Sequence, residues 1–283
     1  MSDAGLDDFL AEEGLPATFR LTLERVCRPL AARAVALRGD LERTAFVGLC
    51  GAQGAGKSTV AAATARLLQA QGLSAVALSL DDFYLSREAR GWLADKVHPL
   101  MAVRGPPGTH DVALACAVLD NLVRPETTPL PAFDKGRDER RPKAEWCEVQ
   151  GPLDVVIFEG WCVGARPQSA AMLKRPINAL EAALDADGAW RRYVDRQLAQ
   201  PYQALFDRLD ALVLLAAPGF EVVRAWRTEQ EHKLIARTGA GMSDEAVARF
   251  IEHYERLTRW ILEEMPGRAD WTIPLAPDRT PLA

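Results

Sequence analysis

Residues 51–58 read GAQGAGKS and fit the pattern G-x-x-x-x-G-K-[ST], which is typical of loops that cradle phosphate groups. The glycines let the backbone wrap around an anion with its amide N–H groups pointing inward. A helical pattern follows directly, and the start of that helix adds free N–H donors and the positive end of a dipole. The segment therefore predicts a phosphate site.

Two side chains of this loop have chemistry of their own. Lys57 is expected to reach the β- and γ-phosphates of a nucleotide, and the Ser58 hydroxyl is expected to bind Mg²⁺. A glycine-rich turn without a ligand is the alternative, and the strand before the loop and the helix after it argue against that. A GTPase is not indicated, because the chain lacks a D-x-x-G switch after a strand and an N-K-x-D motif.

Carboxylates follow two of the apolar runs that look like strands. Asp81 and Asp82 come directly after residues 75–80, and Glu159 follows residues 155–158. Phosphoryl transfer to a hydroxyl group needs a proton acceptor, and Asp81 is the predicted base. Asp82 is expected to assist magnesium or orient the loop, or else to cap a helix. Glu159 is expected to hold Mg²⁺ or orient a substrate, or else to face solvent.

Polar side chains cluster in two further segments that fit an anionic substrate. The stretch HPLMAVRGPPGTHD contains Arg104, His110 and Asp111, and an arginine beside helix-end donors suits a small anion. Asp111 as a simple helix cap is the alternative. The stretch PAFDKGRDERRP contains Asp134 and Lys135, which would contact substrate or would belong to a surface loop.

A basic helical segment follows the fourth apolar run. Residues 218–237 read PGFEVVRAWRTEQEHKLIAR, and Arg227 is the member most favoured for a role over the phosphates. Kinases commonly close such an element to stabilise developing charge and exclude water from ATP. A solvated amphipathic face with Glu–Lys pairing is the alternative.

The elements that would position these residues alternate along the chain. Short, nearly continuous apolar runs predict buried parallel strands at residues 45–49, 75–80, 155–158 and 211–215, with a weaker fifth at 271–275. Helices are predicted at 58–71, 112–122, 178–206, 221–237 and 243–264, the last capped by Ser243, with 104–109 and 124–131 as loops. Residues 1–43 also have helical spacing, with Gly39 as the stop.

This alternation predicts an α/β fold, a doubly wound, mainly parallel five-stranded sheet with helices on both faces. The predicted division is an N-terminal helical extension, residues 1–43, packed on a kinase domain, residues 44–283.

Composition narrows the possible partners. The net charge of −5 over 283 residues comes without a basic stripe, which disfavours nucleic acid. The five cysteines form no C-x-x-C pair, so neither a disulfide framework nor a zinc site is indicated. Because no run of about 18 apolar residues and no basic leader is visible, we expect a cytoplasmic protein that does not span a membrane.

Taken together, the motifs resemble the D-glycerate 3-kinase family. The resemblance rests on GAQGAGKST, SLDDFYL, RGPPGTHD, FDKGRDERRP, VIFEGW, WRTEQEHKL and GMSDEAVARFIEHYERLT, and it covers residues 46 to 283. The wider group of P-loop kinases includes uridine kinase, pantothenate kinase and phosphoribulokinase. One departure is the compact DKGRDERR, where plant-like members have a longer DKS…G-x-GDR loop.

The resemblance implies phosphorylation of D-glycerate to 3-phosphoglycerate with ATP and Mg²⁺. It implies that ATP phosphates are bound by Gly51, Ala52, Gln53, Gly54, Ala55, Gly56, Lys57, Ser58 and Thr59. It implies that Lys57, Asp81, Glu159 and Arg227 act in catalysis, with Ser58 and Glu159 on the metal. The implied acceptor site contains Asp82, Tyr84, Arg104, His110, Asp111, Asp134 and Lys135.

Three alternatives stay open at this point. The acceptor could be another small hydroxyl compound, such as a nucleoside, pantothenate or a sugar phosphate. The chain could be a P-loop ATPase switch that acts on a protein partner, although the strand-end DDFY suits an acceptor pocket better. It could also be a binding protein without catalysis, which the presence of Lys57, Ser58, Asp81 and Glu159 disfavours.

Overall fold

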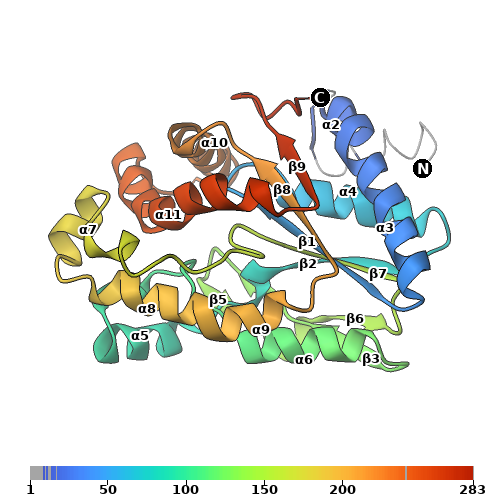
Figure 1. Ribbon diagram of the computed structural model, residues 1–283, viewed down its shortest axis with the longest axis horizontal. Coiled ribbons are helices and arrows are strands. Elements are labelled where there is room, and N and C mark those ends of the chain that lie inside the picture. Colours follow the sequence, from blue (N-terminus) through green and yellow to red (C-terminus); the bar gives the residue numbers. More distant parts are fainter. Residues whose placement is uncertain (1–8, 10, 12–13, 17, 240, 283) are drawn as a thin grey trace.

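A computed structural model describes residues 9, 11, 14–16, 18–239 and 241–282, and a central parallel sheet organises them (Figure 1). Its strands are β1 Ala45–Gly51, β2 Ala75–Ser79, β7 Val155–Gly160, β8 Ala211–Ala216 and β9 Trp271–Pro274. They lie in the order β2-β7-β1-β8-β9, and every neighbouring pair is parallel. The predicted five-stranded sheet is thereby confirmed.

Helices cover both faces of this sheet, as predicted. The α-helices are α2 Phe19–Thr22, α3 Arg28–Leu41, α4 Lys57–Gln69, α5 Arg87–Lys96, α6 Val112–Leu122, α7 Ala179–Leu184, α8 Ala189–Gln197, α9 Gln203–Phe206, α10 Phe220–Thr238 and α11 Asp244–Glu264. In Figure 1, α3 and α4 lie on one face, and α6 and α9 lie on the other. Ser243 caps α11 as predicted, because its hydroxyl accepts the N–H of Ala246.

Short helical turns complete the chain path. Two π-helical segments, η1 Leu23–Cys27 and η6 Leu198–Tyr202, continue into α3 and α9. The 3-10 turns are η2 Leu80–Phe83, η3 Pro99–Ala102, η4 Lys143–Glu145, η5 Met172–Lys174 and η7 Met265–Gly267.

Two helix predictions are wrong. The first helical layer does not stop at Gly39, because α3 continues to Leu41 and ends at Glu42, which takes a left-handed conformation with φ 52°. The predicted helix over 178–206 is divided into α7, α8, η6 and α9. Gly188, with φ 77°, separates α7 from α8, and Pro201, which lacks an N–H, lies within the π-helical η6.

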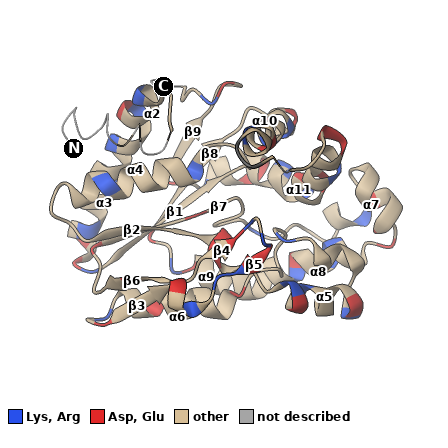
Figure 2. Ribbon diagram, turned by 180° about the vertical axis from the view of Figure 1, so that it is seen from behind, with Lys and Arg blue, Asp and Glu red and all other residues tan. Residues whose placement is uncertain are grey.

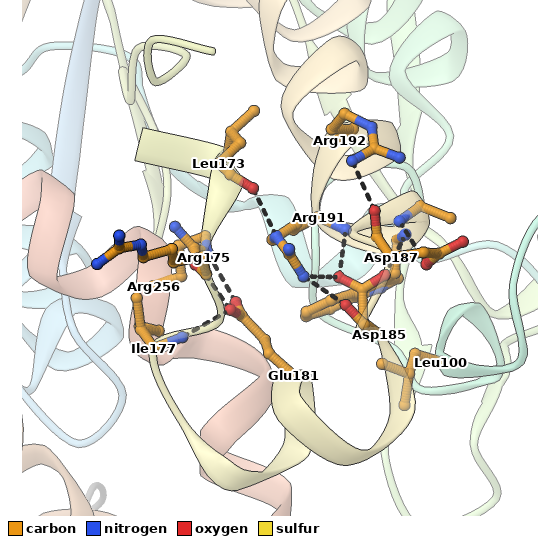
Figure 3. Close-up of polar contacts among 12 residues, drawn as sticks. Leu100, Leu173, Arg175, Ile177, Glu181, Asp185, Asp187, Arg191, Arg192 and Arg256 are labelled. Atoms are coloured by element: carbon orange, nitrogen blue, oxygen red, sulfur yellow. Dashed lines mark hydrogen bonds and ion pairs between the residues drawn. The ribbon is translucent and has the colours of Figure 1, made fainter. Parts of the chain in front are cut away.

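Buried ion pairs hold this divided region together (Figure 3). The side chains of Asp185 and Arg191 are 0% and 1% exposed, and their charged atoms lie 2.9 Å apart. Arg191 also donates to the carbonyl of Leu173 at 2.7 Å. Glu181 of α7 pairs with Arg256 of α11 at 2.6 Å, so this ion pair ties α7 to α11.

Two small antiparallel pairs lie in segments for which no strand was predicted. β3 Thr127–Leu130 pairs with β6 Cys147–Gln150, and β4 Phe133–Asp134 pairs with β5 Glu139–Arg140. Strands of two to four residues are too short to give a periodic pattern, which explains why the sequence did not indicate them.

The N-terminal helical layer packs on α4, and its Leu30 and Ala34 belong to the main hydrophobic core. The parts of the predicted extension at residues 1–8, 10, 12–13 and 17 lie outside the described residues, and the domain division stays a prediction. In the described part of the chain, we find no helix with the length and apolar character needed to cross a membrane.

Candidate active site

The glycine-rich loop connects β1 to α4 and adopts a conformation that only glycine takes easily. Gly54 and Gly56 have φ angles of 80° and 87°, and Gly56 directly precedes α4. A Cβ atom at Gly54 would lie 2.6 Å from the Cβ of Trp226 in α10. The loop therefore packs tightly against α10, the helix of the predicted basic segment.

Ser58 and Glu159 form a pair of oxygen donors beside this loop. The Ser58 hydroxyl donates to the Glu159 carboxylate at 2.7 Å, and Glu159 is 4% exposed at the end of β7. The Lys57 ammonium donates to the carbonyl of Ala52 at 3.3 Å. Within the described ranges no cluster of three or more His, Cys, Asp and Glu side chains is suited to a metal. The two donors fit Mg²⁺, which prefers oxygen ligands and commonly takes one or two from the protein beside substrate phosphates.

Asp81 lies immediately beyond β2, in the turn η2, and the register brings that strand end to Glu159. Ser79 of β2 is opposite Glu159, which is also opposite Leu49 of β1. The Asp81 carboxylate accepts from Lys135 at 2.6 Å and from the Tyr84 hydroxyl at 2.8 Å. The base predicted from sequence therefore lies at the strand-end edge that carries the loop.

Charge controls the protonation of Asp81. Burial would raise its pKa, but the adjacent Lys135 ammonium, with smaller contributions from Lys57 and Tyr84, brings the pKa well below the usual value. The negative charge of Asp81 in turn raises the pKa of Lys135. The influence of Lys57 shows that Asp81 and the loop lysine lie within electrostatic range of each other.

Asp82 has a different environment from Asp81. Burial raises its pKa to about 6, and its carboxylate accepts the N–H of Phe133 at 3.1 Å. It does not cap α5, because Ser86 does so through the N–H of Ala89. Asp82 thus fastens the β4–β5 hairpin, residues 133–140, to the end of β2. Figure 2 shows acidic and basic residues together at this hairpin.

The hairpin brings a carboxylate to Arg104. One nitrogen of the Arg104 guanidinium pairs closely with Asp138, which also pairs with the buried Arg90 at 2.7 Å. The Arg104 guanidinium lies 5.7 Å over the ring of Phe133. The backbone carbonyl of Arg104 accepts a hydrogen bond from the Tyr254 hydroxyl at 2.7 Å. Arg104 is thus held on several sides while its side chain stays 26% exposed.

The other predicted acceptor residues differ in what they contact. His110 is buried, with its ring stacked on Tyr84 at 4.5 Å. Asp111 caps α6 through the N–H of Leu114 and pairs with Arg140 at 3.3 Å, so both its predicted cap role and an ion pair are present.

Asp134 is the predicted acceptor residue whose carboxylate points into its own turn. One oxygen accepts the N–H groups of Gly136 and Arg137 at 2.9 and 3.0 Å. These bonds lower its pKa, Arg137 contributing most, and they stabilise the hairpin. Its contact with substrate stays a prediction.

Arg227 of α10 faces the same region. It pairs with Glu231 at 2.5 Å, lies 5.7 Å over the ring of Phe250, and its side chain is 18% exposed. Burial raises the pKa of the Tyr254 hydroxyl, with a contribution from Asp81, while Arg104 and Arg227 oppose it. Tyr254 therefore lies within electrostatic range of all three charged groups.

A cavity of about 350 Å³ adjoins the glycine-rich loop on the side of the chain ends. It is lined by Gly54–Gly56 and Thr59, by Gln230 and Lys233 of α10, by residues of α2 and η1, and by the C-terminal residues 278–281. Arg279 donates to the carbonyl of Gly54 at 2.8 Å, and Arg25 donates to the carbonyl of Pro281 at 3.1 Å. The C-terminal segment is thus fixed between the loop and η1.

No family model matches the chain. The chain is 38% identical over 222 residues to the uncharacterized kinase mug58 of Schizosaccharomyces pombe, covering 75% of this chain and 79% of that protein. It is 31% identical over 226 residues to the chloroplastic D-glycerate 3-kinase of Arabidopsis thaliana, covering 76% of this chain and 47% of the plant protein. Its fold matches D-glycerate 3-kinase from Cryptococcus neoformans with a TM-score of 0.77 and 27% identity, over 92% of this chain and 98% of that chain.

The chain belongs to the D-glycerate 3-kinase family. It is a P-loop kinase that transfers a phosphoryl group to an alcohol group of a small molecule. The family and the fold predicted from the motifs are confirmed, whereas the roles of the individual site residues stay predictions.

Three residues of this kinase site were missed at the level of sequence. Tyr254 comes from α11 and Arg279 from the C-terminal segment, and both reach the site over more than 100 residues of chain. The sequence does not single out Asp138, because the residues around it in DKGRDERR are mostly charged as well. Its φ of 56°, which aspartate tolerates better than most residues, is visible only in three dimensions.

Proposed function

We propose that this kinase transfers the γ-phosphoryl group of ATP to the 3-hydroxyl of D-glycerate, which yields 3-phosphoglycerate and ADP. The observation that carries the proposal is the half-buried Asp81 carboxylate at the end of β2, hydrogen-bonded to Tyr84 and within electrostatic range of Lys57. A base in this position suits transfer to a hydroxyl group. Two relatives named D-glycerate 3-kinase support the choice of acceptor.

The cavity beside the loop supports ATP as the donor. Its volume of about 350 Å³ is within the usual range for small-molecule sites, and residues 54–56 of the phosphate loop line it. In this proposal the adenine base enters the cavity and the triphosphate follows the backbone of residues 51–59. The helical extension, residues 1–43, then has a second role besides packing, because α2 and η1 line the cavity.

Ser58 and Glu159 would hold Mg²⁺ beside the β- and γ-phosphates. The metal, when bound, would neutralise part of the charge on the transferred group. Lys57 would contribute a positive charge from the loop. Arg227 would add another from α10, and its present partner Glu231 keeps it aligned along that helix.

On the acceptor side, Arg104 would bind the carboxylate of glycerate, and Asp81 would accept the proton of the 3-hydroxyl. The hydroxyl oxygen forms a bond to the γ-phosphorus, while the bond from that phosphorus to the oxygen bridging to the β-phosphate breaks. Lys135 must leave or share the Asp81 carboxylate for this step, because its bond lowers the basicity of Asp81.

A screen of acceptors with purified protein and Mg-ATP tests the proposal. ADP release should rise sharply with D-glycerate and stay near background with uridine, pantothenate and ribulose 5-phosphate. Asp81→Asn should lower turnover by about 10²–10⁴ with nearly unchanged ATP affinity. Asp120→Asn, which changes an aspartate of α6 that pairs with Arg208, is the matched control and should keep full activity. Activity with another acceptor class alone, or an Asp81→Asn variant at full rate, would contradict the proposal.

Two further predictions concern the location of the protein and its partners. The cytoplasmic location, expected from the lack of a long apolar run and a basic leader, and the absence of a nucleic-acid partner, expected from the net charge of −5, stay predictions.

A further inference from the structure

His110 carries a buried nitrogen that has no hydrogen-bond partner among the described residues. The residue is 4% exposed, and the atom concerned is Nε2 of its imidazole ring. Buried polar side-chain atoms in folded proteins are paired in the large majority of cases, because an unpaired one loses its hydrogen bonds to water without replacement. The atom is therefore a candidate for a contact with a ligand.

The other ring nitrogen shows which tautomer is present. The Tyr202 hydroxyl oxygen lies 2.5 Å from Nδ1 of His110, and it also accepts the N–H of Gly108 at 3.0 Å. Tyr202 is completely buried, so its hydroxyl hydrogen must find an acceptor inside the protein, and Nδ1 is the acceptor in reach. Tyr202 therefore donates to Nδ1, and the proton of a neutral His110 is on Nε2.

The surroundings keep His110 neutral. Burial lowers its pKa to about 4, against a smaller opposite contribution from Asp81. A cationic imidazole beside Asp81 would compete with Lys135 for that carboxylate. A neutral ring instead leaves Asp81 as an anion and offers a single N–H donor.

The position of the ring connects it to the acceptor site. His110 stacks on Tyr84 with ring centroids 4.5 Å apart, and the Tyr84 hydroxyl donates to Asp81 at 2.8 Å. Tyr202 contacts one edge of the imidazole from η6, and Nε2 is on the other side of the ring. The free donor is thus one aromatic ring away from the proposed base.

We propose that Tyr202 is a positioning residue that fixes His110 as the Nε2–H tautomer, so that His110 donates a hydrogen bond to an oxygen atom of the acceptor. The inference rests on the proposed kinase function and adds Tyr202 and a defined donor to its acceptor site. Binding of the acceptor oxygen would satisfy the buried nitrogen. This hydrogen bond would strengthen binding of the acceptor and would leave binding of ATP unaffected.

Tyr202→Phe tests this with minimal change in volume. The acceptor KM should rise about three- to tenfold, the range expected for one neutral hydrogen bond, while the ATP KM and kcat change less than twofold. Tyr193→Phe is the matched control from the neighbouring α8, because its hydroxyl has no hydrogen-bond partner among the described residues. It should leave the acceptor KM unchanged. An unchanged acceptor KM in Tyr202→Phe, or an equal rise in the ATP KM, would overturn the proposal.

A second variant separates positioning from packing. In His110→Gln the amide N–H replaces the Nε2–H donor and has no tautomer to fix, so adding Tyr202→Phe should cause no further rise in the acceptor KM. A further rise of the same size as in the unmodified chain would show that Tyr202 does not act through His110.

A direct measurement does not depend on activity. The ¹⁵N NMR shifts of His110 in the full-length protein should show a neutral ring protonated at Nε2, and Tyr202→Phe should change the tautomer populations. A ring protonated at Nδ1 would refute the positioning role even in an active enzyme. If no hydroxy acid is phosphorylated but the Nε2–H tautomer is found, the proposed function fails while the assignment of the tautomer stands.

Discussion

Gly54→Ala should destabilise the protein through a contact between the phosphate loop and α10. The new Cβ would lie 2.6 Å from the Cβ of Trp226 and 3.2 Å from its backbone carbonyl carbon. Because the first contact is with an atom next to the helix backbone, α10 itself must shift to relieve it. Gly72→Ala is a matched control, since Gly72 has a similar φ of 85° but nothing within 4 Å of its would-be Cβ.

The two variants share every energetic effect except the contact with Trp226. A left-handed conformation costs an alanine about 1–2 kcal/mol, and the stiffer unfolded chain returns about 0.4–1 kcal/mol. The overlap at Gly54 adds about 1–3 kcal/mol. With an unfolding entropy of about 0.6 kcal/mol per kelvin for 283 residues, Gly54→Ala should melt about 2–5 °C below Gly72→Ala.

Thermal unfolding followed by circular dichroism measures this difference, and titration with ATP measures its consequence. Gly54→Ala should also weaken ATP binding, because the loop and α10 can no longer keep their spacing, whereas Gly72→Ala should bind ATP normally. Equal melting temperatures for the two variants would refute the reasoning that the loop is packed against Trp226.

Three further outcomes are expected. Asp185→Asn should lower the free energy of unfolding by about 3–5 kcal/mol, measured by urea denaturation, because it leaves the fully buried Arg191 without its counter-charge; a loss below about 1 kcal/mol would contradict this. Lys135→Gln should move the acidic limb of the pH profile of kcat/KM to higher pH, since the cation that lowers the pKa of Asp81 is removed; an unmoved limb would exclude Asp81 as the titrating base. His110 should contribute stability that is complete above its unfolded pKa of about 6.5 and is lost as the pH falls toward its folded pKa of about 4, a loss of about 2 kcal/mol between pH 7 and 5. Urea unfolding at both pH values should show this dependence in the unmodified chain and a weaker one in His110→Gln, and equal slopes would argue against a buried neutral imidazole.

Local sequence determined the elements on which the site depends. The continuous apolar runs predicted all five strands of the sheet to within two residues at each end, because a strand covered on both faces needs no polar alternation. The glycine pattern predicted the loop before α4, since the left-handed angles at Gly54 and Gly56 favour glycine in any context. The sequence also predicted that Asp81 and Glu159 lie near each other, because the carboxyl ends of parallel strands meet at one edge of a sheet.

Tertiary structure alone decided which groups control those residues. The Lys135–Asp81 and Asp138–Arg104 pairs depend on a hairpin whose strands are two residues long, which is too short to leave a periodic signal. Tyr202 meets His110 across 92 residues of chain, and Tyr254 meets Arg104 across 150. Such contacts arise from the packing of whole helices against the sheet, and a hydroxyl's partner is fixed by that packing rather than by any pattern in the neighbouring residues.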